Sequence, residues 1–115
     1  MSSIGERAFY GCESLKDVTI SDSVTKIGNC AFAYCSSLVG GEEGFELPDS
    51  VKYIGDYAFL GCENLSYIDL GQGVEHIGED IFDRCSELKE IFSNEKIIHF
   101  LETYYGDEFN YGLSK

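Results

Sequence analysis

The chain has 115 residues, of which 43% are hydrophobic and 14% aromatic, and this is enough for one domain with a buried core. Its 8 Lys and Arg stand against 21 Asp and Glu, and the resulting formal charge of -13 excludes binding to the phosphates of DNA or RNA. Because the sequence has no run of 18 apolar residues and no charged-then-apolar leader, it predicts neither direct membrane insertion nor a signal peptide in this chain.

An Ile-Gly pair recurs along the chain and marks a repeat. The pairs begin at Ile4, Ile27, Ile54 and Ile77, at intervals of 23, 27 and 23 residues. A phenylalanine lies five residues after each isoleucine, a cysteine eight after it and a leucine eleven after it: Phe9, Phe32, Phe59 and Phe82; Cys12, Cys35, Cys62 and Cys85; Leu15, Leu38, Leu65 and Leu88. A fixed period of this size is typical of a solenoid, so we expect about four coils of roughly 23 residues.

Each repeat predicts three elements in a fixed order. The glycine permits a sharp bend, and the residues after it (Glu6, Asn29, Asp56 and Glu79) suit the start of a helix of one or two turns with the phenylalanine and cysteine on its inner face. Apolar residues then alternate in DVTI, YIDL and EIF, which predicts short parallel strands on one face. A valine three residues before each of the later Ile-Gly pairs begins a second extended segment on a return side.

The second repeat contains an insertion near residues 39–44. The stretch LVGGEEGFEL has four more residues than its equivalents, and its glycines suit a loop. If the loop bulges outward, Phe45 and Leu47 take the positions that Val18 and Ile20 hold in the first repeat.

The two ends of the solenoid differ. Residues 1–93 are expected to form the leucine-rich coils, and residues 94–115 a C-terminal capping helix and tail, because apolar residues follow at helical spacing between a cap at Asn94 and a stop at Gly106. At the other end no strand precedes Ile4, so the first coil is incomplete. We expect either that earlier repeats are missing or that this end stacks on another copy.

The repeats LKDVTISDSVTKIGNCAFAYCSSL and LSYIDLGQGVEHIGEDIFDRCSEL resemble the BspA-type leucine-rich repeat over residues 4–93. The departures are small: the proline of the pattern survives only as Pro48, Ser21 and Gly71 stand in its place elsewhere, and Ile81 replaces an alanine. The resemblance implies an α/β leucine-rich-repeat solenoid. It also implies a family made largely of bacterial and protist surface proteins that bind host proteins, matrix or other cells without catalysis.

Four of the five cysteines share one repeat position, namely Cys12, Cys35, Cys62 and Cys85. Equivalent residues of neighbouring coils form a line of side chains that point the same way, which favours free buried thiols over disulfides. A line does not surround a metal ion, close C-x-x-C pairs are absent, and no calcium-loop motif is present. We therefore predict a structural cysteine ladder, no metal and no cofactor. Cys30, outside the ladder, is the one cysteine that could be exposed and reactive.

The two histidines are the candidate bases for catalysis. His76 belongs to the return side and His99 to the C-terminal helix, so neither is expected to meet the cysteine ladder, whereas a nucleophile and its base must be in hydrogen-bond contact. The sequence predicts no enzyme. An activity that uses Cys30 or a histidine is the most remote alternative.

The outward positions of the strands are the best binding candidates, because in a solenoid they form columns. One column contains Asp17, Gly44, Tyr67 and Glu90, and the other contains Thr19, Glu46, Asp69 and Phe92. The aromatic residues could anchor a partner, and the acidic residues favour a basic patch on it. Glu42 and Glu43 of the insertion lie beside these columns as a contact loop or a tolerated bulge.

The expected function is that of a protein-binding module of a cell-surface or extracellular protein, with a host matrix or cell-surface protein as its partner. The alternative is a spacer that holds another domain away from the cell, in which case the acidic residues only keep the open face soluble.

Overall fold

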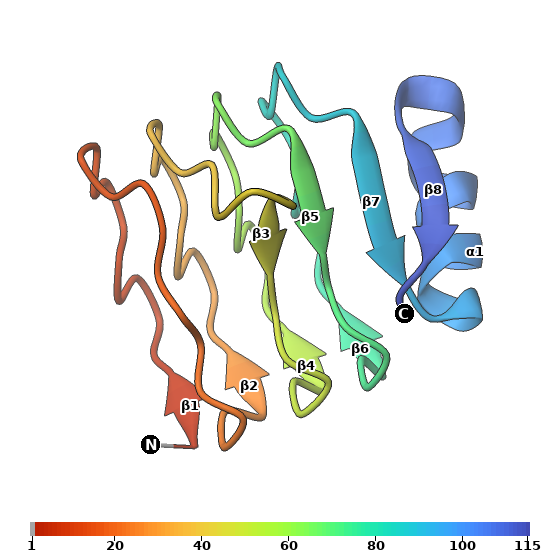
Figure 1. Ribbon diagram of the computed structural model, residues 1–115, viewed down its shortest axis with the longest axis horizontal. Coiled ribbons are helices and arrows are strands. Elements are labelled where there is room, and N and C mark those ends of the chain that lie inside the picture. Colours follow the sequence, from red (N-terminus) through yellow and green to blue (C-terminus); the bar gives the residue numbers. More distant parts are fainter. Residues whose placement is uncertain (1) are drawn as a thin grey trace.

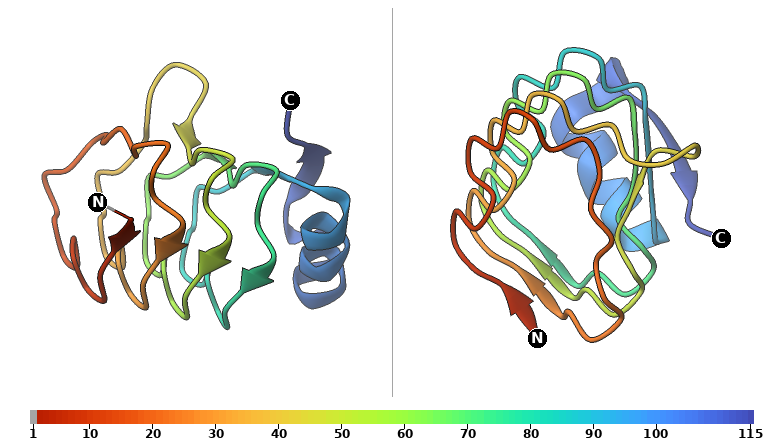
Figure 2. Two further views of the ribbon diagram at one scale, coloured as in Figure 1. Left: turned by 90° about the horizontal axis from the view of Figure 1, so that it is seen from below. Right: turned by 60° about the vertical axis from the view of Figure 1, so that its left-hand side comes forward.

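The computed structural model describes residues 2–115 as a stack of coils wound about one axis (Figures 1 and 2). Two parallel sheets form two sides of the stack. The return side contains β1 (Ser3–Ile4), β2 (Lys26–Ile27), β4 (Tyr53–Ile54) and β6 (His76–Ile77), in that order. The strand side contains β3 (Phe45–Glu46), β5 (Tyr67–Asp69), β7 (Glu90–Ser93) and β8 (Asn110–Leu113). The predicted parallel strands are confirmed for the second, third and fourth repeats, as β3, β5 and β7.

The Ile-Gly repeat sets the register of the return side. Ile4 pairs with Ile27, Ile27 with Ile54, and Ile54 with Ile77, each in parallel. Each of these isoleucines is buried, while the other residue of its two-residue strand is exposed to solvent. The short extended segments that the sequence predicted before the three later Ile-Gly pairs are therefore present, and β1 is a further one at the first pair.

The third side of the stack, which we call the turn side, consists of turns. The prediction of short helices on this side is therefore wrong. Within each coil, amides bond three residues back: Ala8 N to Gly5 O, and Cys12 N to Phe9 O. Alternate amides bond to the neighbouring coil, as Phe9 N does to Ala31 O at 2.8 Å. The second residue after each Ile-Gly glycine has a left-handed backbone, with φ between 51° and 58°, and this ends any helix.

Two of the four polar residues predicted to start those helices, Asn29 and Asp56, connect coils instead. Asn29 Oδ1 accepts a hydrogen bond from Asp56 N, and Asp56 Oδ1 accepts one from Glu79 N, each at 2.9 Å. A side chain that bonds the next coil is no longer free to cap its own turn. The turn side is thus a third hydrogen-bonded ladder.

The core is a stack of the repeated phenylalanines. The rings of Phe9, Phe32, Phe59 and Phe82 follow one another with centroids 5.1, 5.3 and 6.1 Å apart, the first two pairs nearly parallel. Phe45 packs edge-on against Phe32 and Phe59. It occupies the core position that the sequence assigned to it, because it pairs with Ile68 of β5.

The insertion changes the first coil as well as the second. Val39 N and Gly40 N both bond to Lys16 O, after which the chain leaves the sheet as a projecting loop closed by the two hydrogen bonds between Gly41 and Gly44 (Figure 2). The chain rejoins the strand side only at β3, which pairs with β5 alone. Residues 17–20, predicted as a strand, therefore have no strand partner and form none.

Residues 94–115 contain α1 (Glu95–Tyr105), the 3-10 turn η1 (Gly106–Glu108) and β8. Asn94 caps α1 by accepting the amide of Ile97, and α1 ends at Gly106, at the residues that the sequence indicated. Ile97 and Leu101 are buried against the last coil. The segment described as a tail is a strand, since β8 pairs with β7 over four residues.

The cysteines of the ladder are linked from coil to coil. The Sγ atoms of Cys35, Cys62 and Cys85 each donate to the carbonyl of a phenylalanine in the preceding coil, at 3.1 Å. These three are buried, whereas Cys12 in the first coil is half-buried. All five cysteines are free thiols.

Burial of the ladder predicts loss of stability in alkali. Burial raises the pKa of Cys35 from 9.0 to about 11 and that of Cys85 to about 12, and raises that of Cys62 as well. Because the folded-state pKa lies above the unfolded one, the stabilisation is complete below pH 9 and is lost as the pH rises through 9 towards 11, at up to about 1.4 kcal/mol per pH unit per thiol. We expect the urea midpoint to fall over pH 9–10, and to fall less in Cys62→Ala. Equal slopes in both proteins would contradict this.

Candidate functional site

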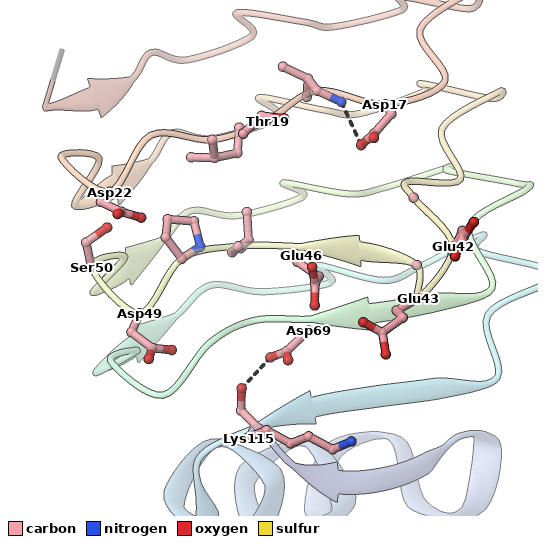
Figure 3. Close-up of a pocket in the computed structure, with 17 residues that line it drawn as sticks. Asp17, Thr19, Asp22, Glu42, Glu43, Glu46, Asp49, Ser50, Asp69 and Lys115 are labelled. Atoms are coloured by element: carbon pink, nitrogen blue, oxygen red, sulfur yellow. Dashed lines mark hydrogen bonds between the residues drawn. The ribbon is translucent and has the colours of Figure 1, made fainter.

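Two hollows lie on the exposed face of the strand side. The first hollow, of about 890 Å³, separates the first coil from β3 and is rimmed by the insertion (Figure 3). The second hollow, of about 520 Å³, runs across β5 and β7 towards β8. They share Glu42, Glu43, Glu46, Asp69 and Lys115, so together they form one continuous surface, which we call the strand face.

All of the strand and loop residues proposed from the sequence line this face. Asp17 and Thr19 line the first hollow, and Tyr67, Glu90 and Phe92 line the second. The register places Glu46 beside Asp69 on β3 and β5, and places Tyr67 beside Glu90 and Asp69 beside Phe92 on β5 and β7. Both columns therefore exist from the second coil onward, whereas Asp17 and Thr19 stand apart across the first hollow (Figure 3).

The two aromatic residues of the face differ in availability. Tyr67 is 38% exposed. Phe92 is half-buried because its strand neighbour is Gly112 of β8, where a Cβ atom would lie 2.7 Å from the Phe92 ring. The ring of Phe92 thus covers a glycine, and Tyr67 is the side chain free to meet a partner.

Asp69 is held by internal hydrogen bonds, as are Asp17 and Asp49 of the strand face, which accept the amides of Val18 and Gln72. Asp69 Oδ1 accepts hydrogen bonds from Gly71 N at 2.9 Å and from the hydroxyl of Ser114 at 2.6 Å. It therefore holds the end of β8 against β5. Glu42, Glu43 and Glu46 are exposed, and Glu90 is half-buried.

The charge of the face is strongly one-sided. The first hollow is lined by seven acidic residues (Asp17, Asp22, Glu42, Glu43, Glu46, Asp49 and Asp69), and Lys115 is the single basic residue that lines either hollow. Carboxylates gathered in a concave surface raise the local concentration of cations and cationic side chains. The face is suited to a basic surface patch.

Sequence reasoning missed what β8 contributes to the face. Leu113 and Lys115 line the second hollow, and Leu113 is 56% exposed. A signal was present: Phe109, Tyr111 and Leu113 alternate, as residues of a strand do, and Phe109 is buried while Tyr111 is half-buried. Such a short alternation after a helix is easily taken for a tail.

The residues considered for catalysis are not brought together. His76 lies on β6, where its ring stacks on Tyr53 at 4.5 Å, and His99 is exposed on α1. Cys30 is half-buried on the turn side. In residues 2–115 no group of three His, Cys, Asp or Glu side chains is arranged to hold a metal ion, and no helix has the length and apolarity needed to cross a membrane.

Comparison with known proteins agrees with this architecture. A leucine-rich repeat protein from Bacteroides capillosus is 33% identical, with a TM-score of 0.69 over 81% of this chain and 63% of that one. The T. pallidum leucine-rich repeat protein is 29% identical, with a TM-score of 0.59 over 79% of this chain and 51% of that one. The chain thus spans about half to two thirds of the length of these two proteins. No curated protein matches it.

The family model described as "BspA type Leucine rich repeat region (6 copies)" matches residues 2–105, nearly the whole chain. Leucine-rich repeat proteins of this kind generally act in protein interaction or as structural elements, and are typically not enzymes. The match, the stacked coils and the parallel strands agree: the chain belongs to the BspA-type leucine-rich repeat family.

Proposed function

We propose that this protein is a non-enzymatic binding module that recognises a basic patch of a partner protein through the strand face. One observation carries the proposal: Tyr67, an exposed aromatic residue, lies in a hollow whose other lining residues include Glu42, Glu43, Glu46 and Glu90. An aromatic anchor surrounded by charge is the arrangement in which single residues contribute most to protein binding.

The acidic residues would act mainly on association and specificity. Their potential attracts a basic partner and repels an acidic one, and salt screens this attraction over about 8 to 10 Å. Leu113 at the end of β8 adds an apolar contact, and Lys115, two residues further on, adds one positive charge. The favoured partner therefore carries Lys or Arg residues around an apolar or aromatic centre.

The cell-surface setting is part of the same proposal. We expect the full-length protein to present these coils outside the cell, where a host matrix or cell-surface protein is the partner. The resemblance to a family rich in surface proteins supports this expectation.

A structural spacer is the second candidate function. Coils that stack through hydrogen-bonded ladders are stiff along the solenoid axis, which suits the task of holding another domain at a distance. In that case the acidic residues keep the exposed face soluble, and the strand face binds nothing in particular.

The test is capture of matrix and plasma proteins by the immobilised chain, compared with Tyr67→Ala and with Glu46→Gln combined with Glu90→Gln. We expect Tyr67→Ala to weaken binding at least about tenfold, since truncating a central aromatic anchor costs about 2 kcal/mol or more. The charge variant is expected to slow association and to reduce the salt dependence.

Tyr57→Ala is the matched control, because Tyr57 is also 38% exposed but does not line either hollow. Phe92 is left unchanged, because substituting it would remove its contact with Gly112, and a loss of binding could then reflect a loss of folding. If the intact chain captures nothing, the spacer is favoured. If both tyrosine variants lose capture equally, the strand face is not the binding site.

A further inference from the structure

A second surface, away from the strand face, lies where the last coil meets α1. There a small pocket of about 130 Å³ is lined by Ile77, Ile81 and Leu101 at its apolar centre, with Phe100 and Tyr104 on the helix side and His76 on the strand side. An apolar cavity of about 150 Å³ is large enough for a benzene ring. The volume of this pocket therefore matches one aromatic or aliphatic side chain.

The pocket exists because α1 covers the last coil less completely than another coil would. Ile27 and Ile54 are fully buried under the coils that follow them, whereas Ile77 remains 9% exposed. On the strand side, β7 is continued by β8, but on the return side β6 ends the sheet. The apolar edge at β6 is left partly open.

The helix presents aromatic rings towards solvent beside this opening. Phe100 is 44% exposed and Tyr104 is 52% exposed, and their rings lie 6.2 Å apart and nearly parallel. The Tyr104 hydroxyl donates a hydrogen bond to Asp80, which fixes this ring across the boundary between helix and coil. Rings held in place in this way lose little conformational entropy when a partner binds.

Charges and acceptors around the pocket favour a cationic ligand. Glu79 and Asp80 are among the residues that line it, with the Asp80 carboxylate accepting the Tyr104 hydroxyl, and the whole chain carries a charge of -13. The carbonyls of Glu75 and Ile77 have no hydrogen-bond donor within residues 2–115, whereas the equivalent carbonyls of Lys52 and Ile54 accept amides from the next coil.

The return side already contains an example of the expected contact. Along this sheet, Lys26 Nζ lies 5.0 Å from the centre of the Tyr53 ring, and the opposite neighbour of Tyr53 is His76 of the pocket. Because this row of rings already contacts a lysine ammonium at one end, its exposed end at His76 can bind a second cation.

We infer that the junction of β6 and α1 is a docking site for a protein segment in which an aromatic side chain is flanked by lysine or arginine. The aromatic side chain fills the pocket above Ile81 and Leu101, and the cations meet Glu79, Asp80 and the outer ring faces. This surface is independent of the strand face, so the site can exist even if the strand face binds nothing.

The experiment titrates the chain with the capped tripeptide Lys-Phe-Lys and follows the methyl resonances of Ile77, Ile81 and Leu101 by NMR. We expect saturable shifts confined to these residues and their neighbours. The peptides Lys-Ala-Lys, which lacks the anchor, and Glu-Phe-Glu, which reverses the charge, should bind at least about tenfold more weakly.

Two variants test the site itself. Phe100→Ala removes an exposed wall and Glu79→Gln removes a rim charge, and both should weaken binding of Lys-Phe-Lys, the first at least about tenfold. Tyr10→Ala, on the turn side and 48% exposed, is the control and should bind as the unchanged chain does. Equal binding of Lys-Ala-Lys, shifts located elsewhere, no saturable shifts, or unchanged binding by Phe100→Ala would each overturn the inference.

Discussion

Replacing Phe59 by alanine is expected to lower the free energy of unfolding by about 3–5 kcal/mol, the range found for buried phenylalanines. The Phe59 ring is fully buried between Phe32 and Phe82, with Phe45 against its edge. No neighbouring side chain can collapse into the space, because the backbone on every side is fixed by ladders of hydrogen bonds. For a domain with a total stability of 5–15 kcal/mol, a loss of this size removes a large share of the stability.

Urea unfolding followed by circular dichroism measures this loss. Phe100→Ala provides the matched control, because it removes the same ring from a position that is 44% exposed, and it should cost no more than about 1 kcal/mol. If Phe59→Ala cost as little as Phe100→Ala, the stacked rings could not be the core of the fold.

Gly55→Ala is expected to cost about 1–3 kcal/mol, since it inserts a methyl group where two coils meet. A Cβ atom on Gly55 would lie 2.7 Å from the backbone nitrogen of Asn29 and 2.9 Å from the carbonyl carbon of Gly28. These are backbone atoms, so the coils would have to separate. The glycine is needed for close approach and not for a left-handed conformation, because its φ is not positive.

Gly5→Ala is the matched control for this prediction. Gly5 holds the same place in the first coil, but a Cβ atom there would have no neighbour within 4 Å. Alanine also restricts the unfolded chain, so Gly5→Ala should leave the urea midpoint unchanged or raise it by the equivalent of up to about 1 kcal/mol. A large loss in Gly5→Ala, or none in Gly55→Ala, would show that coil spacing does not depend on these glycines.

The stacking of the coils could be predicted from the sequence because it follows from residues that repeat. The Ile-Gly pairs determined the register of the return side, and the excess length of LVGGEEGFEL correctly placed Phe45 in the core. Both follow from the spacing of apolar residues, which can be read from the sequence alone.

The conformation of the turn side could not be predicted in the same way. Arg7, Cys30, Tyr57 and Asp80 share a left-handed backbone, yet these residue types give no common signal for it. The amides of Arg7, Cys30 and Tyr57 bond to the next coil, and such bonds exist only once the coils have stacked. A local reading of Asn29 or Asp56 as a helix start therefore fails.

The composition of the strand face was predictable only in part. The columns from Glu46 to Phe92 follow from the repeat, but β8 lies outside it, and the covering of Phe92 and the fixing of Asp69 both depend on β8.

The energetics of the cysteine ladder could likewise be predicted only in part. Because Cys62 Sγ already bonds to Phe32 O, a serine hydroxyl at this position has an acceptor, so Cys62→Ser should be milder than the loss expected for a hydroxyl without one.

Because the insertion interrupts the strand side, we expect the solenoid to open first at its first coil. The first coil is joined to the second by β1, by the turn side and by the bonds to Lys16, but it has no strand of its own beside β3. Hydrogen exchange of amides such as those of Arg7 and Phe9 then requires only local release of this coil, whereas exchange at Phe59 requires disruption of coils on both sides. The loop with Glu42 and Glu43 stands at that boundary, so a ligand that bridges the first hollow would tie down the part of the molecule that opens first.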